Sequence, residues 1–172
     1  MIMRTGQQLL LPASPVFIWT SLLMALLLNM LPLGRMPWLP DFLVLVLVFW
    51  NVHQPSRIGI GVAFIFGLGM DVHQSALLGQ HALSYTAVSF FAALIHRRLL
   101  WFSVPSQAVQ VLPLFAAAHG VELILRMMAG GIFPGWIMLL APLSEALLWP
   151  VVSIVLLAPQ RRAPDPDQNR PL

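Results

Sequence analysis

Charged side chains are too scarce in this chain to cover the surface of a water-soluble domain. Of its 172 residues, 9% are charged and 59% are hydrophobic, and the mean hydropathy is +0.84. Soluble domains carry roughly 25% charged and about 45–50% apolar residues. Disorder is excluded as well, because disordered chains are poor in apolar residues and rich in charge. The chain is therefore expected to fold in a lipid bilayer.

Six apolar segments approach the roughly 17–25 residues that a helix needs to cross a bilayer. Their predicted bounds are 15–31, 40–53, 58–71, 77–95, 105–128 and 136–157. The predicted fold class is an all-α integral membrane protein, a bundle of about six transmembrane helices that forms a single membrane domain over 1–158. Residues 159–172 have no apolar periodicity and predict a disordered cytoplasmic tail.

All nine basic residues are arginines, and their placement predicts the orientation. With six spans, one side holds Arg4, Arg57, Arg97, Arg98, Arg161, Arg162 and Arg170, and the other holds Arg35 and Arg126. Cytoplasmic loops of membrane proteins carry an excess of basic residues. Both termini are therefore expected in the cytoplasm. Five spans would separate the C-terminal arginines from those of the other cytoplasmic turns.

The third segment carries small residues at every fourth position around a carboxylate. These positions are Gly59, Ala63, Gly67, Asp71, Ser75 and Gly79. Residues four apart share a helix face, and small ones let another helix approach closely. Two interpretations stay open. The face packs within the molecule, with Asp71 capping a neighbouring helix, or it forms a groove or pocket for a partner helix or a small ligand.

Four further polar residues fall inside the later segments, where ionisable groups are costly and mark specific structure. They are His119, Glu122, Arg126 and Glu145. Glu122 precedes Arg126 by four residues, which favours an ion pair on one helix face that His119 can share. This pair explains the cluster more simply than a metal or proton-relay site. Glu145 lies near a predicted kink at Pro150, and Asp41 is expected to have a structural role in the first turn of the second segment.

The sequence lacks a complete set of the catalytic residues that intramembrane enzymes use. The stretch from Gly67 to Asp71 is one residue too long for the Gly-x-Gly-Asp element of aspartyl proteases, and their Tyr-Asp element is missing because Thr86 follows Tyr85. The five histidines form no His-x-x-x-His pair, and there is no cysteine. The sequence therefore argues against an enzyme, and no metal or other cofactor is expected.

A longer pattern of residues runs through the chain in a specific order. It includes Trp50, Pro55, Arg57, Gly67, Asp71, Gly79, Trp149 and Pro150. This pattern resembles the MreD family of rod shape-determining proteins, of the Gram-negative type, over about residues 15–158. The resemblance implies a non-enzymatic inner-membrane scaffold of the bacterial elongation machinery that helps to maintain rod shape by organising lateral peptidoglycan synthesis. It also implies a six-helix fold similar to the substrate-binding component of vitamin transporters.

The resemblance implies partners as well. MreC is the expected direct partner, through its transmembrane helix, and MreB, RodZ, RodA and a class B penicillin-binding protein are expected members of the same complex. No nucleic acid partner is expected. A second class of function stays open, a substrate-binding membrane component for a small or lipid-linked molecule. It draws on Asp71, His119, Glu122 and Glu145, side chains that a helix bundle can bring to one cavity.

Overall fold

The computed structural model describes residues 13–31 and 38–160, which form six α-helices and two short 3₁₀ helices. The α-helices are α1 (Pro15–Met30), α2 (Phe42–His53), α3 (Ile60–Gln74), α4 (Gln80–Leu99), α5 (Val104–Met128) and α6 (Leu140–Leu157), and the 3₁₀ helices are η1 (Trp136–Leu139) and η2 (Ala158–Gln160). The all-α class and the six predicted helices are therefore confirmed. Two bounds differ clearly from the prediction, because α3 continues to Gln74 and α4 runs from Gln80 to Leu99.

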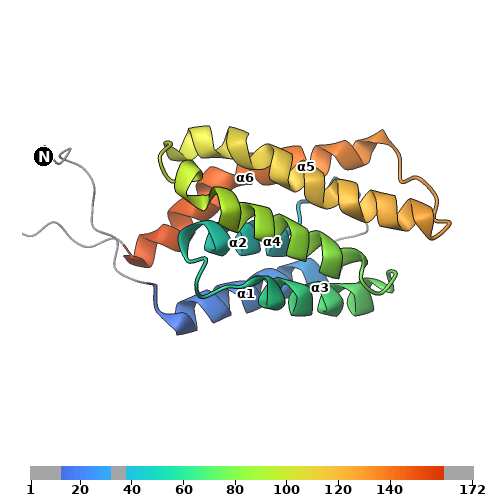
Figure 1. Ribbon diagram of the computed structural model, residues 1–172, viewed down its shortest axis with the longest axis horizontal. Coiled ribbons are helices and arrows are strands. Elements are labelled where there is room, and N and C mark those ends of the chain that lie inside the picture. The colour runs from blue at the N-terminus through green and yellow to red at the C-terminus, as the bar shows by residue number, and fades with distance from the viewer. Residues whose placement is uncertain (1–12, 32–37, 161–172) are drawn as a thin grey trace, which may run out of the picture.

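The helices run up and down in a bundle, with α2 and α4 between the pair α1 and α3 and the pair α5 and α6 (Figure 1). The start of α1, the end of α6 and the turns after α2 and α4 gather at one end of the bundle. The turns after α3 and α5, the end of α1 and the start of α2 gather at the other. Polar residues near these turns are thereby brought together from distant parts of the sequence.

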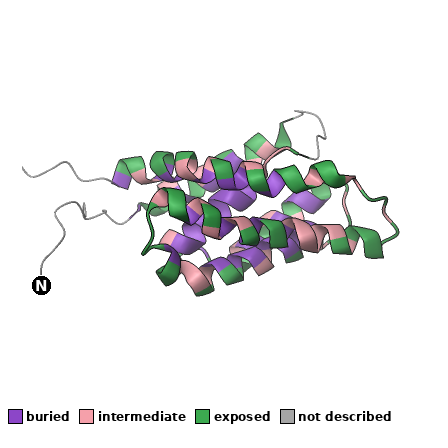
Figure 2. Cartoon of the chain, turned by 90° about the horizontal axis from the view of Figure 1, so that it is seen from above, coloured by how far each residue is buried: buried purple, intermediate pink, exposed green. Residues whose placement is uncertain are grey.

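Helix α2 is enclosed by α1, α4 and α6, and every residue from Leu43 to Val52 is buried. A helix that is apolar all round belongs in the interior of a bundle. The other helices carry exposed residues along their outer sides (Figure 2). Many of these exposed residues are large and apolar, among them Ile65, Val109 and Leu147. An exposed apolar surface of this extent suits lipid tails and not water.

Helix length and composition separate the helices into three groups. Two continuous helical stretches, Val104–Met128 and Trp136–Gln160, are long and apolar enough to cross a membrane. Helices α1, α2 and α3 are apolar but shorter. Helix α4 has 20 residues but is more polar, and His81, Ser84, Tyr85 and Ser89 on it are all buried. Its polar face thus points into the bundle.

The small-residue face of α3 packs directly against α4. Ala63, Gly67 and Asp71 are buried, and a Cβ atom added to Gly67 would lie 2.4 Å from the Cα atom of Ala82. The backbones of the two helices therefore meet at Gly67. Of the two interpretations left open by the sequence, this contact supports packing within the molecule for the inner part of the face, because α4 already fills it. Gly59, at the start of α3, stays exposed.

Several predicted features fall on residues that the structure does not describe. Arg4, Arg35, Arg161, Arg162 and Arg170 lie outside the described residues, as does the predicted tail from residue 161 onward. The first two residues assigned to that tail, Pro159 and Gln160, instead belong to η2, which continues α6.

Candidate functional site

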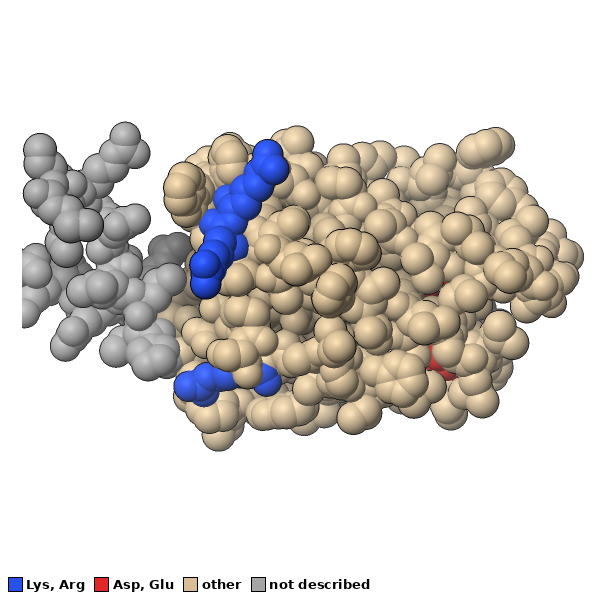
Figure 3. All heavy atoms as spheres, viewed as in Figure 1, with Lys and Arg blue, Asp and Glu red and all other residues tan. Residues whose placement is uncertain are grey.

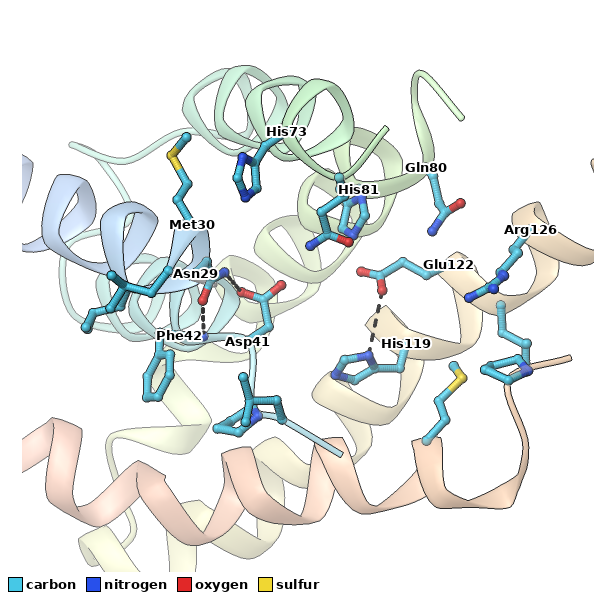
Figure 4. A pocket seen from close by; sticks show the side chains of 18 residues that line it. Asn29, Met30, Asp41, Phe42, His73, Gln80, His81, His119, Glu122 and Arg126 are labelled. Carbon is cyan, nitrogen blue, oxygen red and sulfur yellow. Dashed lines mark hydrogen bonds and ion pairs between the residues drawn. The ribbon is translucent and has the colours of Figure 1, made fainter. Parts of the chain in front are cut away.

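Polar side chains from α1, α3, α4 and α5, together with Asp41 just before α2, surround a cavity of about 710 Å³ at the end of the bundle where α1 ends and α2 begins. The polar lining residues are Asn29, Asp41, His73, Gln74, Gln80, His81, His119, Glu122 and Arg126. Figure 4 shows the Glu122 carboxylate between His81 and His119, with Gln80 and Arg126 on its other side. The apolar residues that line the cavity include Leu28, Leu39 and Met138.

Asp41 joins three helices at the base of this cavity. Its Oδ1 atom accepts from the backbone N–H groups of Leu43 and Val44 at 2.9 and 3.0 Å, so Asp41 caps α2 as expected. The same oxygen accepts from Asn29 Nδ2 at 2.6 Å, and Oδ2 accepts from the Tyr85 hydroxyl at 2.5 Å. These donors belong to α1, α2 and α4, so both oxygens of the Asp41 carboxylate have hydrogen-bond partners within the protein.

Glu145 ties α6 to this cluster. Its Oε1 atom accepts from His119 Nε2 at 2.8 Å and from the backbone N–H of Asp41 at 2.9 Å. The Nδ1 atom of His119 lies 3.7 Å from Glu122 Oε2. His119 therefore stands between two carboxylates from different helices. Within residues 13–31 and 38–160, no group of three His, Asp or Glu side chains has an arrangement that could hold a metal ion.

Asp71 is buried beside the cavity, where it caps the start of α4. Its carboxylate accepts from the backbone N–H groups of Gly79 and His81 at 2.8 and 2.7 Å, and from Ala82 at 3.4 Å. The ring of His81 also donates to it, from Nδ1 at 2.8 Å. The carboxylate thus satisfies the free N–H groups of a helix start. The His81 ring connects Asp71 to the cavity, although Asp71 itself does not line it.

The predicted ion pair between Glu122 and Arg126 is not formed, which corrects the sequence interpretation. Glu122 faces His119 instead, one turn earlier on α5. Its Oε1 atom is buried with no hydrogen-bond partner among the described residues. The Oε2 atom of Glu145 is likewise buried and has no such partner. Arg126 is exposed at the cavity wall and forms no ion pair with a described residue. A helical spacing of four permits such a pair but does not enforce it.

The turn after α5 folds back onto Arg126. The backbone N–H of Gly131 donates to the carbonyl oxygen of Arg126 at 2.9 Å. A Cβ atom at Gly131 would lie 2.7 Å from Arg126 Cγ and 2.8 Å from that oxygen. Glycine therefore lets the turn lie against the stem of the arginine side chain, which limits where the guanidinium group can go.

The opposite end of the bundle is basic. Arg57 follows α2, and Arg97 and Arg98 close α4. In Figure 3 basic side chains gather at this end, whereas little acidic surface is visible, and only toward the other end. Of the acidic residues that the structure describes, Asp71 and Glu145 are buried and Asp41 and Glu122 are partly buried, all in or beside the cavity.

The remaining residues of the sequence pattern have structural positions. Trp50 and Trp149 are both fully buried; their indole N–H groups donate to Ser21 Oγ at 2.8 Å and to Gln107 Oε1 at 3.2 Å. Pro150 lies inside α6, and Pro55 is half-buried in the turn before α3. The two tryptophans thus link α2 to α1 and α6 to α5, and none of these four residues lines the cavity.

Sequence reasoning did not find Asn29, His81 and Tyr85 as members of the site. The spacing of His81 and Tyr85, four apart with Ser89 four further on, places three polar residues on one face of this helix. That signal was available in the sequence. Asn29 offered less, since a single amide near a helix end is common.

Comparison with known proteins identifies the family. The family model for rod shape-determining protein MreD matches residues 12–158. The rod shape-determining protein MreD of Haemophilus influenzae is 30% identical over 129 residues, which cover 73% of this chain and 77% of that protein. No solved structure matches the chain significantly, so the expected likeness to vitamin transporter components has no structural match behind it. The chain therefore belongs to the MreD family of rod shape-determining proteins of the bacterial inner membrane.

Proposed function

We propose that this protein is a non-enzymatic scaffold of the bacterial elongation machinery that binds MreC in the inner membrane and helps to organise lateral peptidoglycan synthesis. The observation that carries the proposal is the family match, which spans all six helices. MreB, RodZ, RodA and a class B penicillin-binding protein are the proposed members of the same assembly.

The proposed orientation places all six helices across the membrane with both termini in the cytoplasm. The basic end of the bundle, with Arg57, Arg97 and Arg98, is then cytoplasmic, as the excess of basic residues in cytoplasmic loops favours. The cavity opens at the opposite end, toward the periplasm.

The proposed contact with the MreC helix is the outer face of α3. Gly61 and Gly69 are exposed there, with Ile65 between them, and no atom lies within 4 Å of a Cβ added at either glycine. Glycines on one face allow two helices in a membrane to approach closely. The inner face, at Gly67, is already occupied by α4.

Co-purification of MreC from membranes tests this contact. Gly61→Leu together with Gly69→Leu should reduce the recovered MreC several-fold, because two large side chains keep the partner helix away. Gly120→Leu is the matched control, since Gly120 on α5 also has open space around its Cα. A photocrosslinker at Ile65 should capture MreC, and one at Leu147 on α6 should not. Unchanged recovery with no crosslink at Ile65 would exclude this face, and failure of wild-type protein to recover MreC would exclude the scaffold proposal.

Ligand binding at the cavity is a second candidate function. The cavity of about 710 Å³ has the size of sites that hold small molecules, which span roughly 300–1,000 Å³. Buried carboxylate oxygens without partners stand in and beside it, at Glu122 and Glu145. Native mass spectrometry of the gently extracted protein tests this candidate, and a spectrum without any retained small molecule or lipid would count against it.

A further inference from the structure

We propose, on the basis of the second candidate function, that the cavity binds a zwitterionic ligand that presents an ammonium group to Glu122 and an anionic group, such as a phosphate, to Arg126. The chemistry is that of phosphoethanolamine, either as a lipid headgroup or as a free small molecule.

Several polar groups of the cavity are already used by the fold. Both oxygens of Asp41 accept from protein donors. The side chain of Asn29 donates to Asp41 and accepts from the backbone N–H of Phe42 at 3.0 Å. One ring nitrogen of His81 is engaged with Asp71. The lining groups that remain for a ligand are the Glu122 carboxylate, the Arg126 guanidinium, the Gln80 amide and the exposed side chains of His73 and Gln74.

The Oε1 atom of Glu122 has no hydrogen-bond donor among the described residues. A buried carboxylate oxygen without a partner is costly, and an ammonium group relieves that cost most fully because it brings both a donor and the opposite charge. His119 does not meet this need, because its Nδ1 atom lies 3.7 Å from the other oxygen, Oε2, and its Nε2 atom donates to Glu145.

Arg126 supplies the complementary group. A guanidinium carries a permanent positive charge and a fork of donors that fits a phosphate or carboxylate, which a simple amine ligand would leave unused. The turn at Gly131 restricts the stem of this side chain. In Figure 4 Arg126, Glu122 and Gln80 lie around the same part of the cavity.

The spacing of the two charges selects the length of the ligand. Glu122 and Arg126 are four residues apart on one helix, so their backbone positions differ by about 6 Å along its axis. An ammonium and a phosphate joined by two carbon atoms match that scale, whereas one small ion cannot engage both side chains. The wall also includes Leu28, Leu31 and Met138, which can receive the apolar part of a lipid.

Competitive binding to the purified full-length protein in detergent tests the proposal. The probes are phosphatidylethanolamine and phosphatidylglycerol with identical acyl chains, followed by native mass spectrometry, and soluble glycerophosphoethanolamine and glycerophosphoglycerol as competitors. We expect about tenfold preference for the ammonium-bearing lipid, since a charge-assisted hydrogen bond has that magnitude. Competition by glycerophosphoethanolamine alone assigns recognition to the headgroup and admits a free ligand. Binding of the lipid without such competition assigns the site to the membrane lipid.

Three variants locate the interaction. Glu122→Gln should abolish the preference for the ammonium group, and Arg126→Gln should weaken both lipids about tenfold. Arg97→Gln, at the other end of the bundle, is the matched control and should bind as the wild type does. Arg126 is exposed, so its substitution should not disturb folding. Arg126→Gln therefore still tests the proposal if Glu122→Gln fails to fold. Equal binding of the two lipids, an unchanged preference in Glu122→Gln, or an unchanged affinity in Arg126→Gln overturns the proposal while leaving ligand binding itself standing. Retention of no probe overturns both, and MreC recovery is measured independently.

Discussion

Asp71 is buried at the end of α3 and controls the start of the next helix. Its carboxylate accepts three backbone N–H groups and the His81 ring, over a separation of eight to eleven residues. A carboxylate in this position offers several lone pairs to donors that have no other partner at a helix start. The role is therefore in the fold, and any influence on the cavity passes through His81.

We expect Asp71→Asn to destabilise the protein by about 1–3 kcal/mol, because the amide keeps one acceptor oxygen and turns an NH₂ group toward backbone donors. Thermal unfolding of the purified protein in detergent measures the change. Gln74→Ala, on the same helix but exposed, should have an effect below about 0.5 kcal/mol. An Asp71→Asn variant as stable as the wild type would show that the cap contributes nothing.

Tyr85 stabilises the buried end of the bundle by donating a hydrogen bond to Asp41. Removing its hydroxyl by Tyr85→Phe leaves Asp41 Oδ2 without the donor that lies 2.5 Å away. The expected loss is about 1–3 kcal/mol of unfolding free energy. Thr86→Val is a fitting control, because the Thr86 hydroxyl donates only to the Ala82 carbonyl of its own helix. Similar melting temperatures for the two variants would contradict a role for the Tyr85–Asp41 hydrogen bond.

At the scale of helices, the contact between α3 and α4 depends on the absence of one side chain. An added Cβ at Gly67 would lie 2.6 Å from the Ala82 nitrogen, and backbone atoms cannot move aside as a flexible side chain can. Gly67→Ala should therefore separate the helices and cost about 1–3 kcal/mol, although alanine favours the helix itself. Gly69→Ala, two residues on with nothing within 4 Å, should be neutral or stabilising by up to about 1 kcal/mol. Equal stability of the two variants, measured by thermal unfolding, would refute this packing.

The sequence predicted which helices exist better than it predicted what their faces touch. Hydrophobic segments and turn residues located all six helices, because each signal is local. The spacing of Gly59, Ala63, Gly67 and Asp71 correctly marked a face for close approach, but spacing does not say whether the approaching helix belongs to the same chain. Likewise Glu122 and Arg126 satisfied the rule for an ion pair, but the carboxylate faces His119 on the same helix. The other ring nitrogen of His119 binds Glu145 on α6, a contact that helical spacing cannot reveal.

At the scale of the whole molecule, packing explains how the shortest α-helix, α2, fits into a bundle of longer helices. Helix α2 has 12 residues, or about 18 Å, against a hydrocarbon thickness of about 30 Å. Because α1, α4 and α6 surround it, its residues contact protein, and its first turn borders the cavity. The same arrangement lets α4 carry buried polar residues. A length criterion applied to one helix at a time cannot anticipate either outcome.

The orientation of the bundle can be measured directly, since the chain contains no cysteine and each introduced thiol is the only one present. Ser56→Cys places a thiol in the exposed turn beside Arg57, and Ala129→Cys places one in the exposed turn after α5, at the cavity end. With a membrane-impermeant maleimide on spheroplasts, we expect Ala129→Cys to be labelled at once and Ser56→Cys only after the membrane is opened.

The physical reason is the distribution of arginines, whose side chains are retained on the cytoplasmic side during insertion. Leu45→Cys controls for access to the interior, because Leu45 is fully buried in α2 and should stay unlabelled in both conditions. The reverse pattern would place the cavity on the cytoplasmic side. It would then also remove periplasmic ligands from consideration, so the orientation decides which ligands can reach Glu122 and Arg126.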